Sequence, residues 1–129
     1  MPTTLTTNGI VVSVEAFYQR QLSEPLADKY TFSYQITLEN KNDFTVQLLR
    51  RHWLIFDSNG AHHEVSGEGV VGEQPILKSG ETYQYASWCN LKTEVGKMVG
   101  IYVMQRQPEG SLFRIKVPEF QLIAPQKMN

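Results

Sequence analysis

Residues 30–38 read YTFSYQITL, and this stretch decides the fold class because apolar and polar side chains alternate strictly along it. Successive side chains of a β-strand point to opposite faces, so one face here is apolar and the other carries hydroxyls and an amide. The pattern predicts a half-buried strand. Its apolar positions are Tyr30, Phe32, Tyr34, Ile36 and Leu38.

The segment before this strand repeats the period of two. Across residues 9–20, apolar side chains from Ile10 to Ala16 share one face. Val11 and Phe17 fall on the opposite parity, which indicates a bulge or a switch between sheets.

The longest strand candidate follows, at Val46–Asp57, and neither of its faces is purely apolar. This mixture indicates that the middle of the strand does more than fill a core. Asn59-Gly60 then predicts a tight hairpin, because both residues tolerate positive φ. The return strand is expected over residues 61–65.

The remainder of the chain continues as short strands between turns. Further strands are predicted over residues 82–88, 99–105 and 112–117, with Pro118 ending the last of them before a closing segment at 120–123. Seven or eight short strands without a convincing helix predict an all-β sandwich or barrel. The length of 129 residues predicts one domain, 1–129, with residues 1–7 disordered and 125–129 a tail.

Composition excludes several classes of protein. The net charge is −1 with no block of like charge, which argues against a nucleic-acid partner. Cys89 is the only cysteine, so no intrachain disulfide is possible. Residues 1–7 lack the features of a signal peptide, and no apolar run approaches the roughly 20 residues of a membrane-spanning helix. We therefore expect a soluble cytoplasmic protein that does not contact a membrane.

Three separated segments carry a resemblance to a known family. They read VQLLRRHW at 46–53, GEGVVGEQP at 67–75 and GKMVGIYVM at 96–104. The chain resembles the ApaG family over nearly its whole length. The resemblance implies an immunoglobulin or fibronectin type III-like β-sandwich of seven to eight antiparallel strands. It also implies a small bacterial protein or an appended module, as in certain F-box proteins, without a firm enzymatic activity and associated with cobalt and magnesium resistance.

One segment departs from the family pattern. Ser87-Trp88-Cys89-Asn90 stands where a small residue such as glycine is expected after the serine. We therefore infer no shared role for Trp88 or Cys89.

The glycine-rich segment 67–75 is the candidate recognition loop. Gly67, Gly69 and Gly72 match a dinucleotide fingerprint as a string, but that mechanism needs a strand before the glycines and a helix opening at them. Pro75 follows instead, and Glu68 and Glu73 place negative charge where a phosphate would approach. A loop that packs closely or binds a partner explains the glycines better.

Arg50 and Arg51 lie in the middle of the long strand and point to opposite faces. Two interpretations stay open. An arginine fork suits an anion or carboxylate ligand. Alternatively, one arginine pairs with Glu68 or Glu73 and pins the loop to the sheet, which we favour.

His52, His62 and His63 are the weak candidates for metal binding. Adjacent strand histidines face opposite ways, and a structural zinc site usually takes four protein ligands. His52 and one of the pair are close enough to meet across the hairpin only in some registers. We predict no cofactor and no dedicated metal site.

A catalytic constellation is not apparent. Nothing in the sequence places a general base beside Cys89, and a lone cysteine is most often buried and inert. We therefore predict that the protein is not an enzyme.

The leading hypothesis is a non-enzymatic binding module that recognises a protein or a small ligand through the loop 67–75 and its supporting strand. The contacts are predicted at Arg50, Arg51, Gly67, Glu68, Gly69, Gly72 and Glu73. The alternative is a divalent-metal or nucleotide-phosphate sensor linked to cobalt and magnesium homeostasis or efflux. A homodimer through an exposed edge strand is a further expectation.

Overall fold

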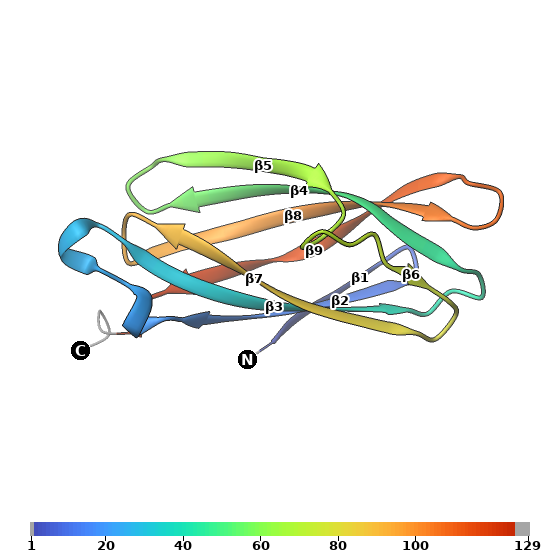
Figure 1. Cartoon of the computed structure of the whole chain (residues 1–129), viewed down its shortest axis with the longest axis horizontal. Coiled ribbons are helices and arrows are strands. Elements are labelled where there is room, and N and C mark those ends of the chain that lie inside the picture. The colour runs from blue at the N-terminus through green and yellow to red at the C-terminus, as the bar shows by residue number, and fades with distance from the viewer. Residues whose placement is uncertain (1, 126–129) are drawn as a thin grey trace.

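The structure of the protein is a computed structural model that describes residues 2–125. Two antiparallel sheets pack face to face as a sandwich (Figure 1). The first sheet has the order β1 (Thr3–Thr7), β2 (Ile10–Tyr18), β3 (Tyr30–Asn40) and β7 (Thr82–Leu91). The second has the order β5 (His62–Glu68), β4 (Val46–Asp57), β8 (Val95–Arg106) and β9 (Leu112–Ile123), with β6 (Ile76–Leu77) also pairing with β4. The helical elements within residues 2–125 are two short 3-10 turns, η1 (Arg20–Leu22) and η2 (Pro25–Ala27).

The predicted all-β, immunoglobulin or fibronectin type III-like sandwich is confirmed, and the strand count needs a correction. Nine strands lie within the described residues instead of seven or eight, because β1 and the two-residue β6 were not foreseen. β1 occupies the segment expected to be disordered, and it pairs antiparallel with β2 from Thr3 opposite Val14 to Thr7 opposite Ile10. Main-chain pairing thus orders a polar segment that has no apolar pattern. Of the expected tail, residues 126–129 lie outside the described part of the chain.

The core lies between the sheets, where β3 contributes the apolar face predicted from its alternation. Ile36 and Leu38 are fully buried there. Trp53 of β4 is the centre of an aromatic cluster, with its ring centroid 5.7 Å from Tyr34, 6.0 Å from Phe120 and 6.1 Å from Tyr102. The pair with Tyr34 joins the two sheets, whereas the pairs with Phe120 and Tyr102 lie within the second sheet. Each edge-on pair adds about 0.5–1.5 kcal/mol beyond the burial of its area.

Two sequence expectations about strand irregularity were wrong. β9 continues through Pro118, because a register shift between Met98 and Gly100 of β8 places an irregularity where proline has no N–H to offer. β2 stays in register with β3 along its whole length, so Phe17 marks neither a bulge nor a change of sheet. Its side chain lies on the outer face, 44% exposed.

A bulge in β4 explains why neither of its two parities is purely apolar. The register with β8 shifts between Leu48 and Arg50, so the inward parity changes at this point. Leu48 is buried before the bulge, and Trp53 is buried after it. The change brings Arg51 onto the inward parity, opposite the buried Tyr102 of β8.

Candidate functional site

Arg51 anchors the glycine-rich loop through its main chain. The Arg51 guanidinium donates from Nη1 to the carbonyl oxygens of Glu68 at 3.0 Å and Gly69 at 2.9 Å. One of the two arginines was predicted to hold the loop on the sheet, and Arg51 is the one that does so. Its partners are main-chain carbonyl oxygens, not the carboxylates of Glu68 or Glu73. Arg50 is exposed on the outer face, directly across the ladder from Glu68.

The bulge supplies a second anchor for the loop. The carbonyl oxygen of Leu49, the residue skipped in the ladder, accepts from the Gly69 N–H at 2.7 Å and from Gln74 Nε2 at 3.0 Å. Gln47 Nε2 in turn donates to the Gln74 carbonyl at 3.1 Å. The bulge thus frees a main-chain acceptor that holds both ends of the loop. Sequence reasoning missed Gln47, Leu49 and Gln74, because a bulge position leaves no clear signal in a strand pattern.

The tip of the loop is a tight turn in which one valine side chain is buried and the next is exposed to solvent. Val70 and Glu73 exchange main-chain hydrogen bonds at 2.8 and 2.9 Å. Val70 is fully buried, whereas Val71 is 61% exposed and has a φ of 48°. A β-branched residue in the left-handed region is strained by roughly 1–2 kcal/mol. The surrounding hydrogen bonds therefore hold an apolar side chain in solvent in an unfavourable conformation.

Close packing accounts for two of the loop glycines. A Cβ on Gly67 would lie 3.0 Å from the Arg51 guanidinium nitrogens, and a Cβ on Gly69 would lie 2.1 Å from the Glu73 carbonyl oxygen. Gly72 has open space around it and a φ of 80°, so it serves the turn geometry alone.

The fingerprint geometry for a pyrophosphate is not formed by this loop. The N–H groups of Gly69, Val70 and Glu73 are used within the protein, and the chain continues into β6 instead of a helix. A phosphate needs main-chain N–H groups that point outward at a helix start.

A tyrosine pair joins the two sheets, and one of its members, Tyr102, lies opposite Arg51 in the ladder between β4 and β8. The hydroxyls of Tyr85 on β7 and Tyr102 on β8 are hydrogen-bonded to each other. Burial raises the pKa of both phenols above the ordinary value, against the opposing effect of the nearby Arg51. Both phenols are therefore neutral at physiological pH and act as structural groups.

The three candidate histidines do not converge. His52 contacts Ser66 at 2.6 Å and Glu64 at 3.3 Å, both on β5. The register places His62 opposite Phe56, on which its ring stacks, and His63 opposite Ile55 on the other face. Within residues 2–125, no group of three or more histidine, cysteine, aspartate or glutamate side chains is placed to hold a metal ion.

Cys89 is buried between the sheets, as expected for a lone cysteine. Burial, with a smaller contribution from Asp57, raises the pKa of its thiol to about 12. The thiolate is the reactive form, so the native thiol is expected to resist a colorimetric thiol reagent at pH 8 and to react fully once denaturant is added. Rapid labelling of the native protein would contradict this placement.

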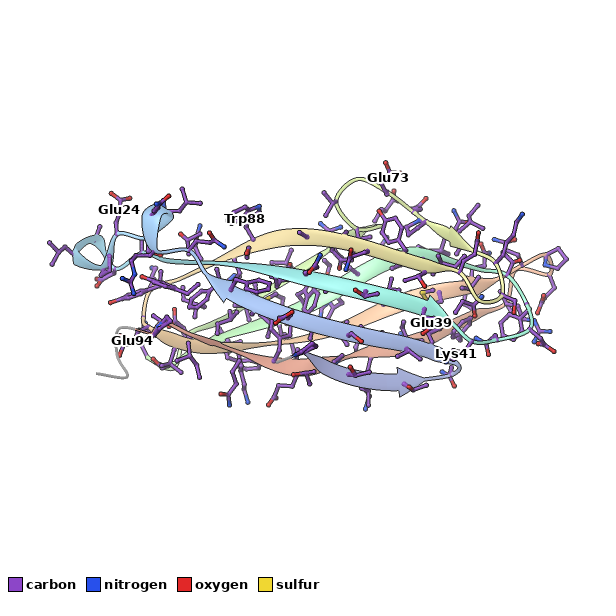
Figure 2. All side chains as sticks on the ribbon, turned by 90° about the horizontal axis from the view of Figure 1, so that it is seen from below. Glu24, Glu39, Lys41, Glu73, Trp88 and Glu94 are labelled. Carbon is purple, nitrogen blue, oxygen red and sulfur yellow. The ribbon has the colours of Figure 1, made fainter. Side chains whose placement is uncertain are left out.

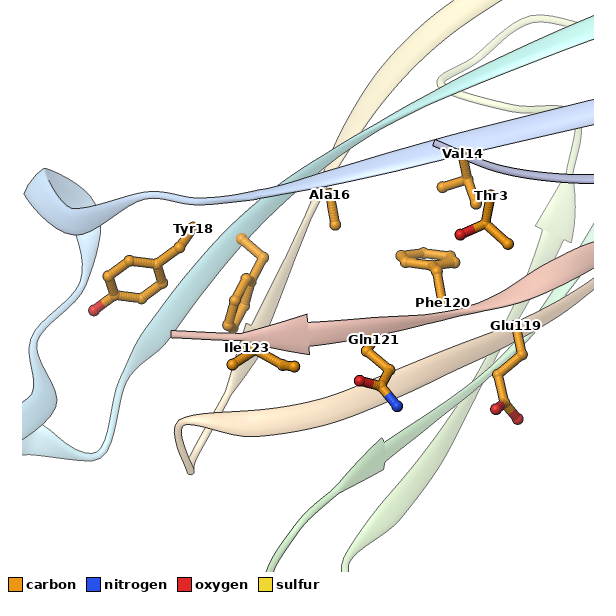
Figure 3. A pocket seen from close by; sticks show the side chains of 9 residues that line it. Thr3, Val14, Ala16, Tyr18, Glu119, Phe120, Gln121 and Ile123 are labelled. Atoms are coloured by element: carbon orange, nitrogen blue, oxygen red, sulfur yellow. The ribbon is translucent and has the colours of Figure 1, made fainter. Parts of the chain in front are cut away.

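The described structure also contains a cavity away from the predicted residues. It measures about 440 Å³ and opens between β2 and β9, whereas the loop lies at the β4–β5 side of the sandwich (Figure 3). Ala16, Phe32 and Phe120 contribute apolar walls, and Thr3 and Glu119 stand among the polar lining. None of the loop residues reaches it.

The fold and the anchored loop define the class to which this chain belongs: a β-sandwich that presents a loop held by main-chain hydrogen bonds. No helix in its described part is long and apolar enough to cross a membrane. The chain is a member of the ApaG family. The family model described as the ApaG domain matches residues 20–106.

Relatives and solved structures agree with this assignment. Protein ApaG of Brucella anthropi is 50% identical over 121 residues, covering 94% of this chain and 92% of the relative, and that of Brucella canis is 47% identical with the same coverage. A crystal structure of a Bordetella pertussis protein described as ApaA is similar with a TM-score of 0.87 and 38% identity, covering 91% of this chain and 94% of the other.

Proposed function

We propose that this chain is a non-enzymatic binding module that recognises a protein partner through the tip of its anchored loop. The observation that carries the proposal is Val71, an apolar side chain 61% exposed and held at positive φ. Strain of this kind persists only where the surrounding structure imposes it, and it is concentrated at functional positions.

The shape of the loop favours a protein over a small molecule as the partner. Figure 2 shows the loop that bears Glu73 projecting from the body of the sandwich. Small ligands bind in concave sites, whereas a projecting tip inserts into a pocket of a partner. Ile76, the residue after the loop, is a second exposed apolar side chain, at 58%.

The charges around the tip indicate the chemistry of the partner. Glu68 and Glu73 flank Val71, are exposed, and make none of the ion pairs that the described residues form. An apolar anchor between carboxylates suits an apolar pocket with a basic rim. This proposal keeps the predicted contacts at Glu68, Glu73 and the loop glycines. Arg51 does not contact the partner in it but holds the loop in place through its hydrogen bonds.

The alternative, a metal or nucleotide-phosphate sensor, has less support. The loop amides are used internally and the three histidines lie apart, as described above. A change in melting temperature on adding cobalt, magnesium or a dinucleoside polyphosphate at millimolar concentration would favour the sensor over the partner-binding module.

Replacing Val71 by asparagine separates stability from recognition. Asparagine tolerates the left-handed region, so Val71→Asn is expected to raise the free energy of unfolding by about 1 kcal/mol. It also removes the apolar anchor, so partners retained by the wild type in an affinity pull-down are expected to be lost. Chemical denaturation measures the first effect and quantitative mass spectrometry the second.

The matched control is Leu112→Asn, since Leu112 is exposed to a similar extent, 62%, at the start of β9. This control is expected to keep every partner. If Val71→Asn retains all partners while folded, the loop tip is not the recognition site.

A further inference from the structure

The outer face of the first sheet is lined by neutral polar side chains, unlike the loop with its apolar and acidic residues. Its outward side chains, which alternate with the core positions of β1, β2, β3 and β7, are mainly hydroxyls and amides. No lysine or arginine occurs at these outward positions of the described strands. A face without cations is a poor site for phosphates or nucleic acid.

Two aromatic side chains interrupt this polar face in a single row. Phe17 of β2 and Trp88 of β7 lie on either side of Ser33 in the strand register. Phe17 is 44% exposed and Trp88 is 57% exposed, so both side chains are partly open to solvent. Neighbouring strands are about 4.8 Å apart, which places the two residues about 10 Å apart across the sheet.

The polar groups between and beside the rings are held in position. Gln19 Nε2 donates to Ser33 Oγ at 2.8 Å, and Gln84 Nε2 donates to Thr37 Oγ1 at 3.1 Å. Ser33, Thr37 and Gln84 stand on paired strands, so they present donors and acceptors with little freedom to move.

A shallow groove continues from this aromatic row along the same face. It measures about 210 Å³, and its lining includes Ser13, Gln35, Thr37 and Gln84. Gln35 follows Ser33 on the outward parity of β3, so the groove begins next to the two rings. The arrangement is a polar groove that ends at a pair of exposed aromatic rings.

We propose that this face, defined by Phe17, Ser33, Gln35, Gln84 and Trp88, binds a neutral polyhydroxylated oligomer, an oligosaccharide. A pyranose ring has an apolar C–H face that packs on an aromatic ring, and its hydroxyls both donate and accept hydrogen bonds. The hydroxyl and amide side chains of this face have the same dual capacity. Two rings about 10 Å apart suit successive units of a chain better than one free sugar.

The absence of basic groups at the outward positions argues further for a neutral ligand. The charged side chains at the outward positions are the carboxylates of Glu15 and Glu39, and Lys41 Nζ, just past the end of β3, lies 3.9 Å from the Glu39 carboxylate. A protein partner is the other macromolecule that uses exposed aromatic residues, but its interface would require an apolar centre that excludes water. Here the centre of the row is Ser33 with its bound Gln19 amide.

The test is a titration of the full chain with cellohexaose, maltohexaose and chitohexaose at millimolar concentration. Tryptophan fluorescence follows Trp88, because Trp53 is buried and insensitive to an external ligand. Amide chemical shifts locate the site. At least one oligomer is expected to perturb Trp88 and the amides of Ser33, Gln35 and Gln84, while the loop 69–75 stays unchanged.

Trp88→Ala and Phe17→Ala are each expected to weaken binding about tenfold, as removal of an aromatic contact does. Leu112→Ala, an exposed apolar residue of the second sheet, is the matched control and should bind as the wild type. Gln84→Ala tests the groove, because it removes one amide from the groove lining. Gln84 is exposed, so the substitution is expected to have little effect on the stability of the fold.

Three results would overturn this assignment: no change with any of the three oligomers, shifts confined to another surface, or wild-type affinity in both aromatic variants. Loss of a protein partner from Trp88→Ala without any response to sugars would make the face a protein interface. Because Val71→Asn leaves this face untouched, it should bind oligosaccharide normally, so failure of the loop proposal and failure of this one are distinguishable.

Discussion

Trp53→Ala is expected to lower the free energy of unfolding by about 3–5 kcal/mol, the usual range for a large aromatic removed from a core. Trp53 is 3% exposed and touches aromatic rings from three other strands. A Cβ on Gly100 would lie 2.5 Å from the Trp53 ring, so the indole packs directly on the backbone of β8. A cavity at this position would therefore remove a large part of the packing between the two sheets. Urea denaturation followed by circular dichroism measures the loss.

The control for this prediction is the second tryptophan of the chain. Trp88 is 57% exposed on the outer face, so Trp88→Ala is expected to change stability by no more than about 0.5 kcal/mol. Equal losses in the two variants would contradict the placement of Trp53 as the centre of the core.

Gly69→Ala is expected to destabilise the protein by about 3 kcal/mol and to release the loop from the sheet. The residue has a φ of 63°, and the added Cβ would lie 2.1 Å from a main-chain oxygen that is fixed by the turn. The left-handed conformation alone costs about 1–2 kcal/mol, and displacement of the loop also weakens the bonds that Arg51 donates. Hydrogen exchange of the Gly69 and Val70 amides is expected to accelerate with the loss of stability.

Gly72→Ala separates the cost of a positive φ from the cost of a steric clash. Gly72 has a positive φ, but an added Cβ would have no neighbour within 4 Å. This variant is expected to lose only about 1–2 kcal/mol and to keep the loop anchored. If Gly69→Ala behaves like Gly72→Ala, close packing against Glu73 does not constrain the loop.

The two proposed surfaces lie on different parts of the sandwich and use different chemistry. The loop tip offers an apolar anchor between carboxylates, supported from β4 by Arg51. The outer face of the first sheet offers two aromatic rings among hydroxyls and amides. The two sites are therefore open to independent tests by single substitutions at Val71 and Trp88. Dimerisation through an edge strand stays a prediction that sedimentation of the full chain tests.

Part of this structure follows from the sequence by itself. The strict alternation of residues 30–38 determines that β3 is a half-buried strand, because the period of a strand is two regardless of what packs on it. The turn residues between such segments determine an all-β chain. These features are local, so they are readable along the chain.

Only the tertiary structure decided how those elements serve the candidate sites. The bulge at Leu49 lies in the ladder between β4 and β8; it places Arg51 on the inward parity, and the Leu49 carbonyl binds the loop. β1 is ordered by pairing with β2 and not by its own composition. Phe17 and Trp88 are far apart in the sequence and come to lie on either side of Ser33 only through strand order and register. Register depends on the packing of every strand simultaneously, which is why no single stretch of the sequence contains it.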